Sequence, residues 1–203
     1  MDWTPAVLDE LRALLGEDGV LAGDAVRLAY ESDALVLERG RPDVVVLPRS
    51  TDEVAALARW AATHAVPLTP RGAGTGLAGG STATSGGLLL VTSRMDQLLA
   101  LDPVRRFAWV QPGLVNARLS ELAAPHDLMF APDPSSQPVS TLGGNVAANA
   151  GGPHCLKHGV TVNHVLGLVV VLADGAVVTL GGEGLDAPGA DLAAVMTGSE
   201  GTM

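Results

Sequence analysis

The sequence predicts an α+β fold, because helix and strand patterns alternate in its first half and an antiparallel pattern follows in its second. Helical spacing over about residues 50–64 separates two strand-like runs, 43–47 and 67–69. In the second half, two β runs within residues 164–180 flank Asp174-Gly175, a dipeptide typical of hairpin turns. We therefore expect a small β-α-β unit followed by a larger, mainly antiparallel sheet with helices.

Local signals place the helices and strands of the first half. Thr4 followed by Pro5 is typical of an N-cap residue and a proline at the first position of a helix. We expect this helix to end at Gly16. A second short helix is expected at about 24–30. Ser50 and Glu53 form a capping box, in which each side chain satisfies the backbone N–H of the other.

The second half carries fewer signals. After a strand at 88–91, the pattern predicts a strand at 107–111 and a helix at 114–124. A loop rich in proline and polar residues follows at 125–138, and residues 141–150 could form a helix with a very small face.

Composition excludes several classes of protein. Hydrophobic residues make up 47% and charged residues 17%, so the chain can bury a core. A net charge of −10 argues against nucleic acid or an anionic membrane as the partner. The apolar run 165–173 is too short to span a bilayer, and no secretory signal opens the chain. Cys155 has no second cysteine for a disulfide. We expect a cytoplasmic protein, or one that reaches a membrane through partners.

Two glycine-rich runs, 70–81 and 140–152, are the most informative part of the sequence. Glycine enters backbone conformations with positive φ and lets a ligand approach the main chain closely. Successive N–H groups in such a turn can bind anionic oxygens. Two surfaces of this kind suit an elongated ligand with a phosphate-rich middle, such as a dinucleotide.

The first run formally fits the motif G-x-G-x-x-G between Gly74 and Gly79. In a Rossmann fold that motif opens a helix, whose N-terminus faces the pyrophosphate. Here residues 80–87 are glycine, serine, threonine and alanine, and a strand follows. The context therefore argues against a Rossmann site, and the P-loop motif is absent from the sequence.

Together with Asp133-Pro-Ser-Ser136, Lys157-His-Gly-Val-Thr161 and Gly198-Ser-Glu-Gly-Thr202, the glycine runs give a family resemblance. The chain resembles the FAD-linked oxidases with a vanillyl-alcohol-oxidase/PCMH-type flavin domain. Within that family it is most similar to the flavin-domain polypeptide of glycolate oxidase and to the D-lactate and D-2-hydroxyglutarate dehydrogenases. The resemblance implies N-terminal helices over 1–33 and a PCMH-type FAD-binding domain over 34–203. Its two subdomains would cover about 34–102 and 103–203.

The resemblance also implies where FAD binds. The first run would wrap the pyrophosphate, the second run would line the other side of the dinucleotide and the flavin ring, and residues 198–202 would approach the adenosine-ribityl part. The implied cofactor-binding residues are Pro70, Arg71, Gly72, Ala73, Gly74, Thr75, Gly76, Ser135, Ser140, Thr141, Gly143, Gly144, Ala148, Asn149, Gly151, Gly198, Glu200 and Gly201.

Two positions depart from the family pattern. Relatives that attach FAD covalently carry a histidine in the first loop, and this chain has Thr75 there. The resemblance therefore implies non-covalent FAD. The family usually has tyrosine between the lysine and glycine of the later motif, where this chain has His158. This substitution leaves an aromatic contact from that position in doubt.

The activity implied by the resemblance is hydride transfer from the α-carbon of a 2-hydroxy acid to flavin N5. In the family, the substrate-binding and catalytic groups lie in a C-terminal cap domain, which we expect to be absent here, so no catalytic residue is named. Two interpretations stay open: the flavin half of an oxidoreductase, or a non-catalytic FAD-binding or structural subunit or fragment of a glycolate oxidase-type complex.

Several polar residues allow two interpretations. Arg71 could counter phosphate charge or simply be solvated. Asn145 and Asn149 could face the ligand together or satisfy groups at a helix end. Three histidines lie close in sequence, at positions 154, 158 and 164, but we expect them in a loop and at a strand start and not on one helical face, and no carboxylate is near them in sequence. We therefore expect no metal site, and we expect the Lys157 side chain to be solvated.

Overall fold

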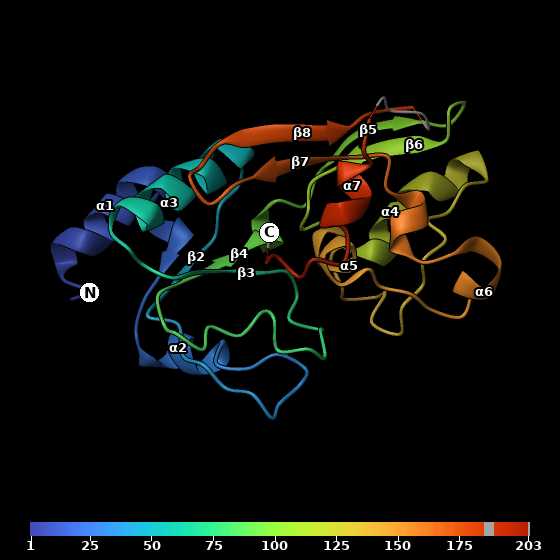
Figure 1. Cartoon of the computed structure of the whole chain (residues 1–203). Coiled ribbons are helices and arrows are strands. Elements are labelled where there is room, and N and C mark those ends of the chain that lie inside the picture. Colours follow the sequence, from blue (N-terminus) through green and yellow to red (C-terminus); the bar gives the residue numbers. More distant parts are fainter. Residues whose placement is uncertain (185–188, 203) are drawn as a thin grey trace. The chain divides into compact units, whose positions relative to one another are not determined.

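A computed structural model describes residues 1–184 and 189–202. The chain divides into two compact units (Figure 1). The first contains Met1–Arg94 together with Val171–Val178, and the second contains Met95–Val170 together with Thr179–Met203. The predicted N-terminal segment 1–33 therefore packs within the first unit. The predicted subdomain boundary near residue 102 stays a prediction.

The first unit is built on a four-stranded sheet in the order β1-β2-β4-β3. β1 is antiparallel to β2, whereas β2 and β3 are both parallel to β4. The strands are β1 (Val20–Leu21), β2 (Val44–Val46), β3 (Leu68–Arg71) and β4 (Leu88–Val91). The predicted strands are confirmed, and β1 is an addition that its two-residue length hides from sequence patterns.

Helices cover both faces of this sheet, with α1 and α3 on one face and α2 on the other (Figure 1). Their bounds are Pro5–Leu15 for α1, Asp24–Ala29 for α2 and Thr51–Thr63 for α3. Val44 and Val46 pack with Leu11 and Leu57 in one cluster, while Val45 belongs to the cluster on the opposite face. Burial on both sides explains why these strands are continuously apolar instead of alternating.

The helix starts follow the predicted caps, with one change. Thr4 Oγ1 accepts from the N–H of Val7 at 3.5 Å, and Ser50 Oγ accepts from the N–H of Glu53 at 3.2 Å. The Glu53 carboxylate accepts from the N–H of Arg49 at 2.6 Å. The predicted return bond to Ser50 is therefore made one residue earlier, and it still satisfies an N–H at the helix entry.

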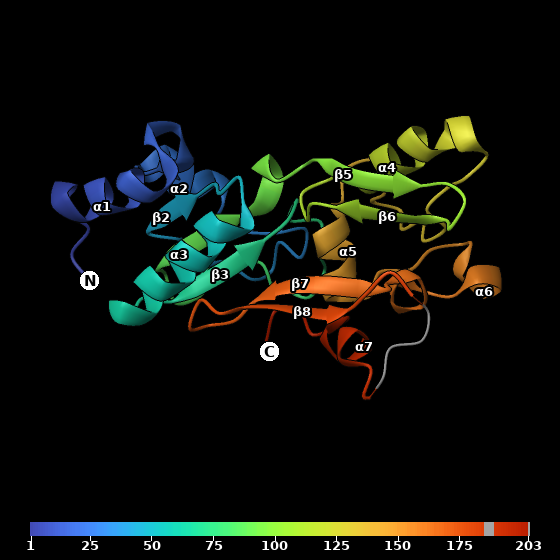
Figure 2. The same cartoon turned by 90° about the horizontal axis from the view of Figure 1, so that it is seen from above.

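In the second unit, an antiparallel pair of strands packs with helix α4 (Figure 2). The pair is β5 (Leu98–Asp102) and β6 (Phe107–Val110), and the helices are α4 (Asn116–Ala123), α5 (Leu142–Ala148), α6 (Cys155–His158) and α7 (Leu192–Met196). Leu114, Leu119 and Leu142 form its buried core. β5 escapes the sequence pattern because its exposed residues are apolar, with Leu99 59% exposed.

β7 (Gly167–Val171) and β8 (Val177–Gly181) form a second two-stranded sheet. The Asp174-Gly175 turn joins them, and Gly175 has φ +79°, as the sequence predicts. The predicted antiparallel pattern is thus divided between two small sheets. β7 begins later than predicted, because residues 161–164 form a short 3₁₀ helix. Within the described ranges, no helix is long and apolar enough to cross a membrane.

Candidate functional site

The first glycine run connects two parallel neighbours, β3 and β4, without a helix. Parallel strands require a crossover connection, because the chain must return to the same end of the sheet before the second strand begins. Residues 72–87 make that return entirely as turns, bends and coil. This confirms that the G-x-G-x-x-G match lacks the helix of a Rossmann site.

The backbone of this loop offers a row of hydrogen-bond donors. Among the residues that the structure describes, no backbone or side-chain group accepts a hydrogen bond from the N–H groups of residues 73–80. Gly74 and Gly79 have φ of +70° and +75°, a conformation that a side chain would disfavour. Donors without a protein partner in a glycine loop are suited to anionic oxygens, as in a phosphate group.

Arg71 stands at the start of the loop and supports its backbone. Its Nη1 atom donates to the carbonyl of Ser32 at 2.9 Å and approaches the carbonyl of Ser81 at 3.4 Å. Its guanidinium carbon lies 5.6 Å from the centroid of the Tyr30 ring. A Cβ atom added to Gly74 would collide with its Nη2 atom. The guanidinium therefore packs against the loop backbone and is not simply solvated.

Burial lowers the pKa of Arg71 from its ordinary value, because desolvation disfavours the charged guanidinium. The Asp33 carboxylate and the Tyr30 side chain act in the opposite direction on that pKa. A positive charge with a nearby carboxylate is thus held directly beside the loop.

The second glycine run has a different construction, because most of its N–H groups are already used. Thr141 caps helix α5 by accepting from the N–H of Gly144 at 3.3 Å. The N–H groups of Leu142 and Gly143 donate to the carbonyls of Leu114 and Pro112, both at 2.8 Å. The backbone here serves the fold of its own unit.

The glycines of the second run allow close packing within that unit. A Cβ atom on Gly143 would lie 2.6 Å from Cβ of Pro112, and one on Gly152 would collide with the backbone carbonyl of Asp133. A Cβ atom on Gly151 would lie 3.0 Å from Val160. Packing explains these small residues independently of any ligand, a reason that the sequence did not reveal.

Three buried polar atoms in this unit lack a hydrogen-bond partner among the described residues: Ser140 Oγ, Asn145 Nδ2 and Asn116 Oδ1. These residues are 3%, 3% and 0% exposed. An unpaired buried polar group is costly, so such atoms point to a further polar partner. Ser140 is a predicted contact, and Asn145 is one of the two asparagines left open. Asn116, a lone asparagine at the start of a helix, gave no signal in the sequence.

Asn149 is used by the protein itself. It ends α5 with a φ of +47°, and its Oδ1 atom accepts from the N–H of Val162 at 2.9 Å. The segment 198–201 also serves α5: the N–H groups of Gly198 and Glu200 donate to the carbonyls of Val146 and Ala147 at 2.9 and 2.8 Å. These bonds satisfy carbonyls that a helix end leaves unpaired.

The histidines lie apart from any cluster of ligands. Nδ1 of His154 lies 3.1 Å from the Asp133 carboxylate, and Nε2 of His164 lies 3.0 Å from the carbonyl of His158. No carboxylate is near these histidines in sequence, but the fold brings the Asp133 carboxylate next to His154. Over residues 1–184 and 189–202, no three His, Cys, Asp or Glu side chains are grouped to hold a metal ion. Lys157 is exposed.

Comparison with known proteins agrees with this architecture. A sequence profile described as "FAD binding domain" matches residues 42–181. Glycolate oxidase subunit GlcD of Escherichia coli (strain K12) is 46% identical over 198 residues, which cover 98% of this chain and 40% of that protein. D-lactate dehydrogenase of Anaerostipes hadrus is 34% identical over 202 residues, covering 98% of this chain and 42% of that protein.

Solved structures show the same fold. An alkyldihydroxyacetonephosphate synthase superposes with a TM-score of 0.84 at 25% identity, covering 99% of this chain and 37% of that one. p-Cresol methylhydroxylase superposes with a TM-score of 0.70 at 21% identity, covering 95% and 38%. The chain spans about 40% of the length of the curated relatives that it matches.

The chain belongs to the FAD binding domain family. It is a flavoprotein domain with a PCMH-type fold, and its cofactor is FAD. The residues present fit that cofactor, because the N–H groups of residues 73–80 in the loop after β3 have no acceptor among residues 1–184 and 189–202. Such donors match the oxygens of a pyrophosphate.

The packing of α5 predicts different tolerances at its two adjacent glycines. Gly143→Ala should destabilise the chain by about 1–3 kcal/mol, because the new methyl group overlaps Pro112. In Gly144→Ala the methyl group has one contact within 4 Å among the described residues, with Thr141 Oγ1 at 3.1 Å. Alanine also stabilises a helix by about 0.8–1 kcal/mol relative to glycine, so we expect Gly144→Ala to destabilise the chain less than Gly143→Ala. Urea unfolding followed by circular dichroism measures both. Equal losses, or a larger loss for Gly144→Ala, would contradict the packing described for Gly143.

Proposed function

We propose that the chain is the FAD-binding portion of a flavin-dependent oxidoreductase that acts on a 2-hydroxy acid. The row of free N–H groups at residues 73–80 carries the proposal for the cofactor. The relatives carry the substrate class: they include glycolate oxidase subunit GlcD, D-lactate dehydrogenase and D-2-hydroxyglutarate dehydrogenase. Glycolate, D-lactate and D-2-hydroxyglutarate all have a hydroxyl group on the carbon next to a carboxylate.

In this proposal the first glycine run binds the FAD pyrophosphate through its backbone. A hydrogen bond to a charged group contributes about 1.5–3 kcal/mol, so several such bonds would orient the cofactor firmly. FAD, when bound, supplies the acceptor for a hydride from the substrate α-carbon, at flavin N5. The residues of this chain would bind and orient the cofactor, and we assign no catalytic residue among them.

In the second unit, Ser140 and Asn145 are the strongest of the proposed cofactor contacts, because each has a buried polar atom without a hydrogen-bond partner in the described part of the chain. The other residues expected from the family resemblance remain proposals. Gly143 and Asn149 have structural roles that already account for them. The relative named as a subunit of glycolate oxidase supports a further proposal, that this chain functions within a complex of that type.

Gly76 offers a clean test of the pyrophosphate site. No atom of the residues that the structure describes lies within 4 Å of a Cβ atom added there, so Gly76→Leu should change the free energy of unfolding by no more than about 0.5 kcal/mol. Its side chain would occupy the space beside the free N–H groups. We therefore expect the dissociation constant for FAD, measured by calorimetric titration, to rise by at least about tenfold.

Gly182 provides the matched control, because a Cβ atom there also has no described residue within 4 Å. Gly182→Leu should retain the affinity for FAD. Gly74 is less suitable, because its positive φ and its contact with Arg71 would disturb the loop itself. Undiminished FAD binding by Gly76→Leu would place the cofactor elsewhere.

The mode of FAD attachment can be tested directly. Thr75 stands where covalently linked relatives are expected to carry histidine, and a threonine side chain cannot form a histidyl–flavin bond. Acid precipitation of the loaded chain should therefore release all of the yellow colour into the supernatant. Flavin that stays with the washed pellet would show a covalent link.

A further inference from the structure

Asp33 is a buried carboxylate beside the first glycine run. It is 6% exposed. Its Oδ1 atom accepts from the N–H of Leu35 at 2.9 Å, and its Oδ2 atom accepts from the hydroxyl of Ser81 at 3.3 Å. Residue 33 precedes the stretch 42–181 that matches the family profile. The carboxylate thus contacts the far end of a loop that lies about fifty residues later in the sequence.

Neighbours of Asp33 hold the beginning of the same loop. The carbonyl of Ser32 accepts from Arg71 at 2.9 Å, and the N–H of Ala34 donates to the carbonyl of Gly74 at 2.9 Å. Three consecutive residues, 32–34, therefore bind both ends of the segment that carries the free N–H groups. The loop has no helix of its own to fix its shape, so these contacts supply that constraint.

Asp33 carries a negative charge, so it can support an anion-binding site only if its carboxylate does not face the anion. A carboxylate that faced a pyrophosphate would repel it. Asp33 is instead buried, hydrogen bonded on both oxygens and close enough to Arg71 to favour its charged form. A buried charge is tolerated when it is paired and hydrogen bonded in this way.

We propose that Asp33 is a positioning residue for the cofactor: through Ser81 and Arg71 it holds the loop so that the N–H groups of residues 73–80 converge on the FAD pyrophosphate. This inference rests on the proposed function and extends it to a residue outside the matched family stretch. Asp33 itself does not touch the cofactor. Its removal should weaken FAD binding while the remainder of the unit stays folded.

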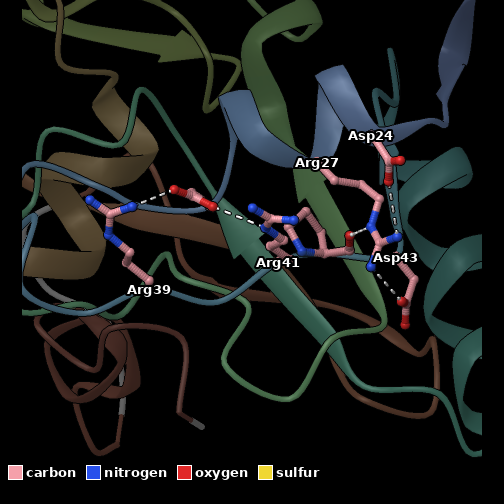
Figure 3. Close-up of polar contacts among 7 residues, drawn as sticks. Asp24, Arg27, Arg39, Arg41 and Asp43 are labelled. Carbon is pink, nitrogen blue, oxygen red and sulfur yellow. Dashed lines mark hydrogen bonds and ion pairs between the residues drawn. The ribbon is translucent and has the colours of Figure 1, made fainter.

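Glu31 supplies a matched control in the same segment. Its carboxylate accepts from Arg39 at 2.7 Å and from Arg41 at 3.0 Å. Figure 3 labels these two arginines. No contact of the Glu31 side chain with residues 70–81 occurs among those that the structure describes. Asp33→Asn and Glu31→Gln each remove one negative charge, so an effect of net charge alone would be the same in both.

The experiment measures the affinities of the wild-type and variant chains for FAD and for FMN, together with their thermal midpoints. Asp33→Asn should weaken FAD binding by at least about tenfold and bring the FAD and FMN affinities closer together, because FMN has no pyrophosphate. Glu31→Gln should bind FAD within about twofold of wild type. A merely structural role for Asp33 would lower the midpoint and leave the ratio of the two affinities unchanged.

Two results would overturn the inference: an unchanged ratio of FAD to FMN affinity in Asp33→Asn, or an equal loss in Glu31→Gln. If Asp33→Asn does not fold, Ser81→Ala decides, because it removes only the hydroxyl that donates to Asp33. That variant should lower FAD affinity by about threefold or more, and unchanged affinity would contradict the inference. Failure of the wild-type chain to bind FAD would instead refute the proposed function.

Discussion

The parallel pairing of β3 with β4 is the constraint on which the candidate site depends. It forces residues 72–87 to travel back along the sheet, and they do so without a helix. A helix would have paired most of its own N–H groups, whereas those of residues 73–80 have no acceptor within the described part of the chain. Because the loop has no helix of its own, contacts with residues 32–34 hold its backbone.

Glycine has a different structural role in each of the two glycine-rich runs. In the first, glycine permits positive φ at Gly74 and Gly79 and leaves open space at Gly76. In the second, glycine permits close contact between α5 and the backbone around it, as Gly143 against Pro112 shows. The family resemblance implies that the second run lines the other side of the dinucleotide and the flavin ring, and that role stays a proposal. The structure adds a packing role for glycines of this run.

The sequence predicted those features that depend on near neighbours. The caps at Thr4 and Ser50, the strands of the parallel sheet and the Asp-Gly turn all follow local rules. It missed β1 and the short helices α6 and α7, because tertiary contacts and not sequence pattern define elements this short. It missed β5 because exposed apolar residues remove the alternation typical of a strand. The support by Asp33 could not be predicted either, since Asp33 and Ser81 are 48 residues apart in sequence and meet only in the fold. The family resemblance supplied the cofactor, which local patterns alone narrowed only to a dinucleotide.

Binding of FAD in this proposal depends on the backbone N–H groups of the first glycine run, which would bind the pyrophosphate. Calorimetric titration of the unmodified chain with FAD and, separately, with FMN tests this claim most directly, because the two ligands share the flavin and differ in the pyrophosphate and adenosine. We expect FAD to bind at least about tenfold more tightly than FMN, a difference of about 1.4 kcal/mol in binding free energy. FMN binding as tightly as FAD would contradict it.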